Sequence, residues 1–381
     1  MRIVQLDLIR CLAVLLVLGR HMTPCPRETS YLIWALTSVW ERGGWIGVDL
    51  FFVLSGFLVS GLLFREYKSR EAVNATHFLI RRGFKIYPAF WAMLATTVAI
   101  SVWFEGALSK RGLIGEVFFV QNYFGALWNH TWSLAVEEHF YLLLALLTVW
   151  LCRRQSKLEN PFALLPTVFV VVAIVCFFLR LHTAVTLPYN HRTHLFATHI
   201  RIDSLLFGVL ISYYWHFKEL SDRTRLSRLA PFLFVVGAIM LAPAFIFPLE
   251  RTKWISVLGL TTFYIGSGAL LLGMLYIDIP DSYLVRCLAG IGTFSYSIYL
   301  WHMPVHEWGI RIARKLAGAP LNWFAYAGIY LAGAIVVGIV ASKIVEYPVL
   351  RVRDRLYPSQ SAQGVSGYFP SHREFTAAAR T

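Results

Sequence analysis

Apolar residues in this chain gather into about ten windows, each long enough to cross a bilayer as a helix, which requires roughly 20 mostly apolar residues. Basic residues cluster in the short segments between the windows. The pattern predicts an all-α fold, a polytopic bundle of transmembrane helices. The expected spans lie near residues 3–22, 44–64, 86–104, 132–151, 163–182, 196–215, 230–249, 254–276, 288–305 and 323–345.

Basic residues also predict the orientation of the bundle, because they favour the cytoplasmic side of short connections. With about ten spans, the two most basic connections place both termini in the cytoplasm of a multi-pass protein of the inner (cytoplasmic) membrane. A third cluster, Arg311, Arg314 and Lys315, then lies outside, against the rule. The two connections follow the second and sixth spans and contain Arg65, Lys68, Arg70, Arg81, Arg82 and Lys85, and Lys218, Arg223, Arg225 and Arg228, respectively.

The chain divides into a transmembrane domain, residues 1–350, and a C-terminal part, residues 351–381. The C-terminal part begins with Arg351, Arg353 and Arg355, a basic segment that agrees with a cytoplasmic location. From Pro358 onward it is polar, which predicts a disordered tail. No second soluble domain is expected.

Composition supports a membrane protein. Hydrophobic residues make up 57% of the chain and charged residues 15%, which is far too apolar for an ordinary globular domain. The net charge of +14 could indicate a nucleic-acid partner, but the basic residues are spread over short connections, where membrane orientation explains them. We therefore expect the lipid bilayer as a partner and no nucleic acid, no bound cofactor and no metal site, and the oligomeric state stays open.

Ionisable residues inside the first span are the main functional signal, because such side chains are costly in lipid and usually face the bundle interior. Arg10 and His21 are eleven residues apart, so they share one helix face about 16 Å apart along the axis. Asp7 lies one turn before Arg10, and an ion pair is the plain structural interpretation of these two. His21 lies at the expected outer end, where a neutral imidazole can accept a proton from a hydroxyl group.

Polar residues in other spans are expected at the same outer depth. Glu137 and Glu138 lie about one to two turns into the fourth span, and only one of them can face a given partner, since consecutive helical positions diverge by about 100°. Ser133 precedes Glu137 by one turn, which favours Glu137 on the serine face. We interpret these residues as lining one outer pocket with His21. The remaining pocket candidates are Trp132, Ser133, Tyr299, His302, Arg201 and Asp203.

A cationic cluster marks the opposite side. Arg81, Arg82 and Lys85 precede Pro88 at the start of the third span, and residues three and four apart are neighbours on a helix. Such a group of neighbouring cations suits a phosphate group. Simple anchoring by positive residues is the more common explanation of an isolated Arg-Arg pair, and the cluster alone does not decide between the two.

Six segments together resemble acyltransferase family 3, bacterial membrane O-acyltransferases that modify O-antigens, exopolysaccharides, Nod factors, macrolides and peptidoglycan. The resemblance covers about residues 6–351 and depends on the order and spacing of the segments. The blocks are the pair Arg10 and His21, Gly-Val-Asp-Leu-Phe-Phe-Val-Leu-Ser-Gly-Phe at 47–57, Arg-Arg-Gly-Phe-Lys-Ile-Tyr-Pro at 81–88, Trp-Ser-Leu-Ala-Val-Glu-Glu-His-Phe-Tyr at 132–141, Ser-Tyr-Ser-Ile-Tyr-Leu-Trp-His at 295–302 and Glu-Tyr-Pro at 346–348.

The resemblance implies an acyl-CoA co-substrate from the cytoplasm and a carbohydrate or glycosylated small molecule as acceptor at the outer face. It implies that Arg10 and His21 are essential and that Arg81, Arg82 and Lys85 bind the donor. Lys85 departs from the arginine usual at its position and cannot make a planar bidentate contact.

The expected mechanism uses His21 as general base, oriented by Glu137 or Glu138, and Arg10 as the charge-stabilising group. Direct transfer and an acyl-histidine relay both remain open, as do the acceptor and the acyl length, with acetyl favoured by the resemblance. The alternative function is a transporter or flippase of a glycan or lipid-linked sugar, since buried charges and many spans suit that class too. A third interpretation takes the charges as structural ion pairs of an assembly scaffold.

Overall fold

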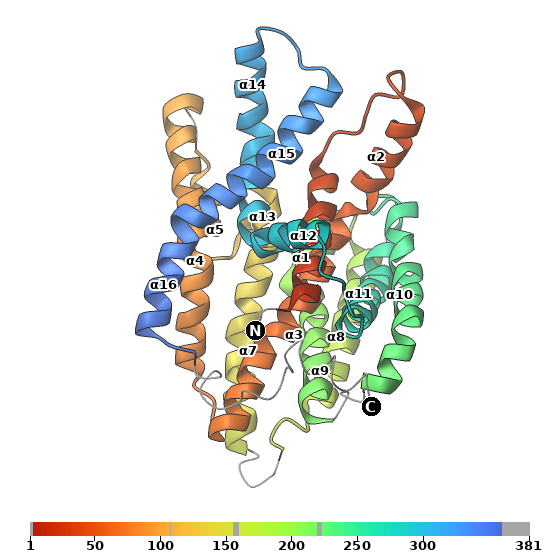
Figure 1. The fold of residues 1–381 in the computed structure, drawn as a ribbon, viewed down its shortest axis with the longest axis vertical. Helices are drawn as coiled ribbons and strands as arrows, with labels where there is room; N and C mark the ends of the chain where they lie inside the picture. The colour runs from red at the N-terminus through yellow and green to blue at the C-terminus, as the bar shows by residue number, and fades with distance from the viewer. Residues whose placement is uncertain (1–2, 107, 155–159, 219–222, 360–381) are drawn as a thin grey trace.

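The computed structural model describes residues 3–106, 108–154, 160–218 and 223–359. These residues form a bundle of helices, and no strand occurs among them (Figure 1). The prediction of an all-α fold is confirmed. The predicted disordered tail lies almost entirely outside the described residues.

Helices occupy all ten predicted windows, and further helices form between them. The α-helices are α1 (Val4–His21), α2 (Tyr31–Gly43), α3 (Gly47–Arg70), α4 (Ala75–Ile100), α5 (Lys110–Val117), α6 (Gln121–Phe124), α7 (Trp132–Arg154), α8 (Leu165–Thr186), α9 (Ile202–Phe217), α10 (Arg223–Ile246), α11 (Leu260–Leu275), α12 (Tyr283–Thr293), α13 (Ser295–Pro304), α14 (Ile310–Ala317), α15 (Trp323–Ala341) and α16 (Tyr347–Leu356). Short 3₁₀- or π-helical segments join them: η1 (Gly44–Ile46), η2 (Ser101–Glu105), η3 (Asn129–Thr131), η4 (Arg192–Phe196), η5 (Thr198–Ile200), η6 (Ile255–Gly259), η7 (Val305–Gly309) and η8 (Ser342–Glu346).

Seven helical segments among the described residues are long and apolar enough to cross a membrane. The protein is therefore a multi-pass membrane protein. α1 and α9 lie in the bundle but are not among the seven: α1 carries three charged residues, Asp7, Arg10 and Arg20, and α9 has only 16 residues. The seven segments are Tyr31–Arg70, Ala75–Phe104, Asn129–Arg154, Leu165–Thr186, Ser227–Ile246, Ile255–Leu275 and Trp323–Leu356.

The ninth predicted span is broken, which corrects the expectation of one helix over residues 288–305. α12 ends at Thr293, and α13 starts at Ser295 after a turn at Phe294. α12 crosses α1 at Gly292, where a Cβ atom would lie 1.8 Å from the carbonyl oxygen of Asp7, so the crossing requires glycine. Hydropathy reports a continuous apolar window but does not report chain direction. The break brings the start of α13 beside the middle of α1.

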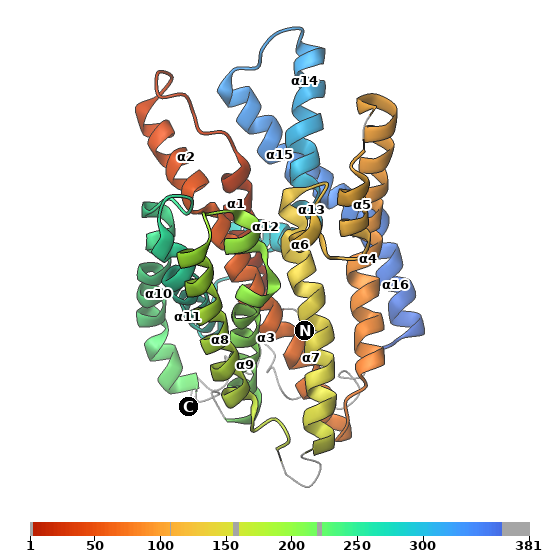
Figure 2. The same cartoon turned by 180° about the vertical axis from the view of Figure 1, so that it is seen from behind.

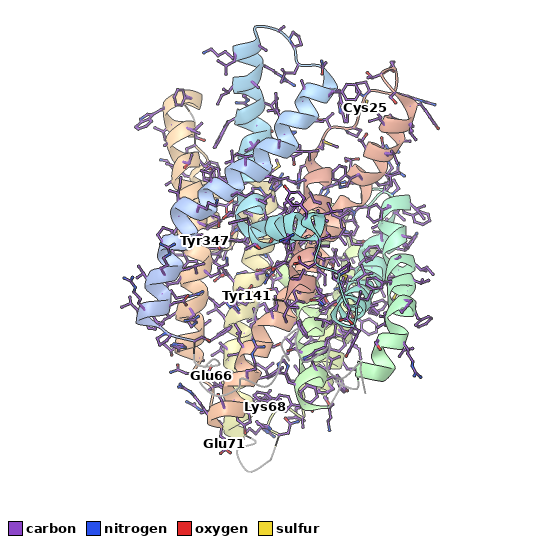
Figure 3. All side chains as sticks on the ribbon, in the orientation of Figure 1. Cys25, Glu66, Lys68, Glu71, Tyr141 and Tyr347 are labelled. Atoms are coloured by element: carbon purple, nitrogen blue, oxygen red, sulfur yellow. The ribbon has the colours of Figure 1, made fainter. Side chains whose placement is uncertain are left out.

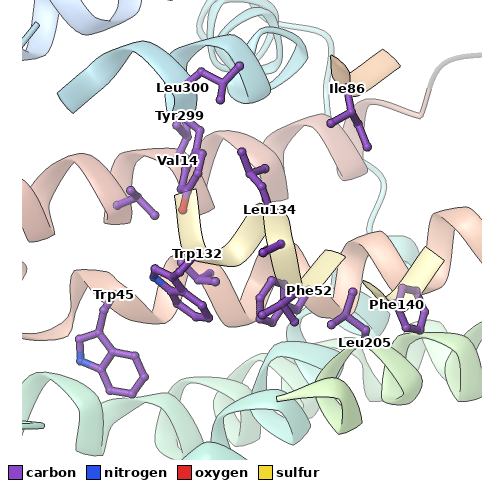
Figure 4. Packing of buried hydrophobic residues seen from close by; sticks show 14 of the residues in the cluster. Val14, Trp45, Phe52, Ile86, Trp132, Leu134, Phe140, Leu205, Tyr299 and Leu300 are labelled. Carbon is purple, nitrogen blue, oxygen red and sulfur yellow. The ribbon is translucent and has the colours of Figure 1, made fainter. Parts of the chain in front are cut away.

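Close helix contacts hold the centre of the bundle. α3 and α9 approach at Gly56 and Gly208, where added Cβ atoms would lie 2.0 Å from the carbonyl oxygen of Leu205 and 2.1 Å from that of Val53. Small residues permit this approach, and dispersion contacts between the backbones then stabilise the pair. The core around this pair includes Phe52, Trp132, Leu205 and Tyr299, which Figure 4 shows on neighbouring helices.

The bundle has two chemically different ends. α3 ends and α4 begins at the end that carries Glu66, Lys68 and Glu71, whereas Cys25, just after α1, lies at the other (Figure 3). We call the first the basic end, after Arg65, Lys68, Arg70, Arg81, Arg82 and Lys85, and the second the histidine end, after His21. α2 and α14, in segments that hydropathy leaves as connections, project at the histidine end (Figures 1 and 2). The site lies between these ends.

Candidate active site

A cavity of about 350 Å³ lies inside the bundle, between α1, α3, α4, α7, α12 and α13. Part of its wall is apolar, from α3 and α7, and the rest carries side chains able to hydrogen-bond or to carry charge. Tyr141, one of them, lies between the two ends in Figure 3. The polar lining residues are Arg10, Ser55, Arg65, Arg82, Lys85, Ser133, Glu137, Tyr141, Thr293, Ser295, Tyr296 and Tyr299.

Glu137 is held in this cavity by a short hydrogen-bonded chain. The Tyr141 hydroxyl donates to Glu137 Oε2 at 2.7 Å, so it accepts from Ser55 Oγ, which lies 2.7 Å away. Glu137 and Tyr141 are four residues apart on α7 and therefore neighbours on one helix face. The Arg82 guanidinium lies 5.7 Å from the centre of the Tyr141 ring. The carboxylate thus belongs to the side of the cavity that carries the cations.

Arg10 lines the same cavity from α1. Its Nη1 donates to Asp7 Oδ1 at 2.9 Å, which confirms the ion pair expected from the three-residue spacing. The Asp7 side chain is buried, whereas about a third of the Arg10 side chain is exposed. The carboxylate therefore holds one terminal nitrogen of the guanidinium, and the side chain has further N–H donors in a residue that lines the cavity.

A second pocket of about 200 Å³ adjoins the cavity at the basic end and shares Leu62, Arg82 and Lys85 with it. Lys85 forms an ion pair with the buried Glu346, and Arg81 pairs with Asp354. Among the described residues, no carboxylate forms an ion pair with Arg82, which lines both spaces. The shared residues show that the two spaces lie side by side, the second nearer the basic end. The pocket is lined by Leu62, Leu63, Glu66, His77, Phe78, Arg81, Arg82, Lys85, Arg353 and Ser359.

His21 does not line the cavity but meets a second imidazole at the histidine end. Its Nδ1 lies 3.0 Å from the Val17 carbonyl oxygen and 3.2 Å from His302 Nε2. His302 Nδ1 in turn lies 2.5 Å from the Tyr299 carbonyl oxygen. A carbonyl oxygen only accepts, so we assign the proton of each neutral ring to Nδ1. His302 Nε2 then accepts from His21, and His21 Nε2 keeps its lone pair.

Tyr299 joins the cavity to this histidine pair. Its hydroxyl donates to the His130 carbonyl oxygen at 2.5 Å and accepts from Ser133 Oγ at 2.7 Å. The His130 ring packs on His302 with centroids 4.8 Å apart, and the Tyr299 ring lies 5.6 Å from His302. The Tyr299 side chain therefore stands between the cavity, which it lines, and the histidines beyond it.

The predicted pairing of His21 with Glu137 or Glu138 is corrected by this geometry. His21 contacts His302, Glu137 binds Tyr141, and Glu138 accepts a hydrogen bond from Tyr87 on α4 at 2.9 Å. Helical periodicity gives the face of a residue on its own helix, but it does not give the rotation and depth of one helix against another. The expected single outer pocket is in fact an inner cavity and a separate histidine pair.

Arg201 and Asp203 also lie outside the cavity, contrary to the prediction. Arg201 forms a buried ion pair with Asp49 at 2.8 Å, and Asp203 pairs with Arg180. These charges neutralise each other between helices, as buried charges must. Trp132 packs face to face on Phe196 with centroids 4.8 Å apart and is also outside the cavity. These three residues position α7 and α9 rather than line the space.

The comparison with known proteins decides the family. Residues 3–343 match a family model described as an acyltransferase domain. The chain belongs to this acyltransferase family. The resemblance to acyltransferase family 3 is thereby confirmed, and it extends over nearly the whole chain.

Two relatives of this acyltransferase-family chain are named O-acetyltransferases. The O-acetyltransferase OatA of Staphylococcus aureus (strain NCTC 8325 / PS 47) is 29% identical over 299 residues, which cover 72% of this chain and 48% of the relative. The peptidoglycan O-acetyltransferase OatA of Listeria monocytogenes serovar 1/2a is 30% identical over 327 residues, which cover 79% and 49%. The chain thus spans about half the length of these relatives. No solved structure matches it.

Several residues of the site in this chain were not predicted to take part. His130 lies two residues before the fourth predicted span, and Tyr141 lies one helical turn after Glu137, a spacing that could have indicated their contact. Glu346 belongs to a segment that carries the resemblance, and it accepts hydrogen bonds from Ser297 and Ser342 besides pairing with Lys85. No local pattern could have indicated that last pairing, because the two residues are 261 positions apart.

Glu116, in α5 outside the membrane-spanning helices, fixes the segment that delivers His130. Its Oε1 accepts from the Leu127 and Trp128 amides at 3.2 and 3.3 Å and from Thr131 Oγ1 at 2.8 Å. The side chain is fully buried, and Oε2 has no hydrogen-bond partner. Burial raises the pKa of this carboxyl from its ordinary 4.5 to about 7, although the three donors oppose the rise.

Replacement of Glu116 by glutamine is expected to make the protein less sensitive to rising pH. Between pH 4.5 and about 7 the folded wild type retains a proton that the unfolded chain releases, so its free energy of unfolding falls with pH, by roughly 3 kcal/mol in all. Glutamine keeps the Oε1 acceptor and does not titrate. Thermal unfolding of both proteins at pH 5 and pH 8 in one detergent measures the difference. An equal pH response in both contradicts the assignment.

Proposed function

We propose that this chain is a membrane-embedded O-acyltransferase. It moves an acyl group, by likeness to the named relatives an acetyl group, from acyl-CoA at the cytoplasmic side to a hydroxyl of a carbohydrate-containing acceptor at the extracytoplasmic side. The single observation that carries the proposal is on α1. Arg10 lines a cavity beside the pocket at the basic end, and His21, about 16 Å along the helix, has an Nε2 with no hydrogen-bond partner among the described residues. The relative from Listeria makes peptidoglycan the first acceptor to test.

The donor enters at the basic end, which the proposal places in the cytoplasm. The pocket around Arg81, Arg82 and Lys85 suits the phosphates of CoA, because guanidinium groups bind phosphate oxygens in charge-assisted pairs. The adjoining cavity accepts the acyl-bearing arm between the apolar wall of α3 and Arg10. Arg10, about 16 Å from His21 along α1, binds a polar group of this arm in the cavity and does not contact the carbonyl that reacts at the histidine end.

The acceptor reacts at the histidine end. His21 Nε2 takes the proton of the acceptor hydroxyl as its oxygen attacks the thioester carbonyl carbon, the carbon–sulfur bond breaks, and CoA leaves as the thiolate. The Nδ1 proton is bound by the Val17 carbonyl oxygen and His302 Nε2. These two acceptors stabilise the positive charge that the ring gains. Tyr299 stands between the two reactants, so its side chain must move aside before the carbonyl reaches the acceptor.

Acyl transfer by the purified protein tests the proposal. The protein in lipid nanodiscs is incubated with radiolabelled acetyl-CoA and soluble peptidoglycan fragments, and both free CoA thiol and labelled glycan are measured. Equal release of thiol and formation of ester are expected. A transporter or flippase yields neither product. Mass spectrometry of envelope glycans from cells with and without the gene then identifies the natural acceptor by the mass of one acyl group.

A further inference from the structure

The C-terminal helix forms one wall of the pocket at the basic end. α16 lies against the first turns of α4 in both views (Figures 1 and 2). Arg353 lines the pocket with Arg81, Arg82 and Lys85. The chain after α16 is tied to α4 as well, because Arg81 donates to the Tyr357 carbonyl oxygen. Residues more than 260 positions apart therefore share one pocket.

Two arginines converge on a single carboxylate oxygen beside this pocket. Arg353 Nε and Nη2 lie 2.9 and 2.8 Å from Asp354 Oδ1, and Arg81 Nη2 lies 3.1 Å from the same atom. The Arg81 and Arg353 side chains are about four-fifths buried, whereas more than half of the Asp354 side chain is exposed. Three donors from two guanidiniums around one oxygen atom match the way in which arginines hold a phosphate oxygen.

The charges of the pocket are unbalanced in favour of an anion. Arg81 and Arg353 share the one carboxylate of Asp354, Lys85 pairs with Glu346, and Arg82 has no ion-pair partner among the described residues. Glu66, the remaining acid of the wall, uses Oε1 to accept from the Asn74 amide. Four basic side chains and the three carboxylates of Asp354, Glu346 and Glu66 thus line or border the pocket, so an anionic group that enters it meets a net positive charge.

We propose that Arg353 of α16 is a phosphate ligand of the donor and that Asp354 occupies the phosphate position until the donor arrives. This inference rests on the proposed function for the identity of the phosphate compound, a CoA thioester. A phosphate oxygen replaces Asp354 Oδ1 between Arg81 and Arg353, and the exposed aspartate side chain turns to solvent. The C-terminal helix thereby completes a site whose other cations come from α4.

Binding of adenosine 3′,5′-bisphosphate, a fragment of CoA that carries two of its three phosphates, tests this inference without any acyl transfer. The full chain in detergent is titrated with this compound by calorimetry, as wild type and as R353Q, D354N and R351Q. Loss of one charge-assisted contact is expected to weaken binding by R353Q about ten- to hundred-fold. D354N is expected to bind severalfold more tightly than wild type, because no carboxylate competes. R351Q is the matched control, since Arg351 is exposed on the same helix and does not line the pocket.

The outcomes separate this inference from the proposed function. Equal binding by R353Q and wild type overturns it, as does an equal loss in R353Q and R351Q, which indicates general surface charge. Weaker binding by D354N shows that Asp354 is a structural tie and removes its role as a placeholder. If R353Q loses binding but the wild type transfers no acyl group from acetyl-CoA, the phosphate site stands and the proposed function fails. If the wild type transfers an acyl group and R353Q keeps the wild-type KM for acetyl-CoA, the proposed function stands and the role of Arg353 as a phosphate ligand fails.

Discussion

Replacement of His21 by alanine is expected to lower kcat for acyl transfer about 10²- to 10⁴-fold, the usual contribution of a positioned general base. The reason is geometric: His21 Nδ1 is occupied by the Val17 carbonyl and His302, so the ring has one free lone pair, on Nε2, to take the acceptor proton. Initial rates of acetyl ester formation at saturating donor measure the effect. KM for the donor should change little, because the pocket proposed to bind it lies at the other end of the bundle.

The matched control is His182→Ala, which removes an exposed imidazole from α8. This variant should retain the wild-type rate. Size-exclusion profiles and thermal unfolding must show both variants folded before rates are compared. A folded His21→Ala protein with a near wild-type rate removes His21 from the mechanism and leaves the transfer to another group.

Replacement of His302 by leucine is expected to lower kcat about 10²-fold, because loss of a buried contact that orients a reacting group has effects of this size. His302 is a positioning residue: its Nε2 accepts from His21 Nδ1 at 3.2 Å, and its own Nδ1 proton is held by the Tyr299 carbonyl. Leucine fills the space but accepts no hydrogen bond, so the His21 ring loses one of its two acceptors. The measurement is kcat for acetyl transfer with KM for the acceptor determined in parallel.

Glutamine at position 302 distinguishes positioning from packing. Its side-chain oxygen can accept from His21 Nδ1 at the place of the lost Nε2, so His302→Gln should recover most of the rate that leucine loses. If His302 merely fills the core, leucine should be tolerated better than glutamine, because His302 is fully buried. Equal activity of both variants and wild type contradicts the assignment.

Arg10 and His21 lie toward opposite ends of the bundle, which gives the proposed site two distinct sides. One helix connects the cavity that Arg10 lines with the histidine pair, and the side chain of Tyr299 both lines the cavity and lies 5.6 Å from His302. In the proposed reaction, a thioester that enters from the basic end approaches His21 through the protein and not through lipid. This arrangement suits the proposed function, in which donor and acceptor lie on opposite sides of a bilayer.

The sequence by itself determined the helices, their apolar windows and the contacts within one helix. The ion pair of Asp7 and Arg10 follows from a three-residue spacing, and the cationic cluster on α4 follows from three- and four-residue spacings. These features are local, because the geometry of a single helix sets them. The family also followed from the sequence, since its motifs are recognised by their order and spacing.

Tertiary structure alone decided which of these residues meet. His21 and His302 are 281 positions apart, and Lys85 and Glu346 are 261 apart. Their pairing depends on how far each helix is rotated and shifted against its neighbours, which close contacts such as that of Gly292 with α1 fix and hydropathy does not encode. For the same reason Glu137 faces the cations and not His21, and the C-terminal helix reaches the pocket on α4: periodicity assigns a residue to a face, and only packing assigns that face to a partner.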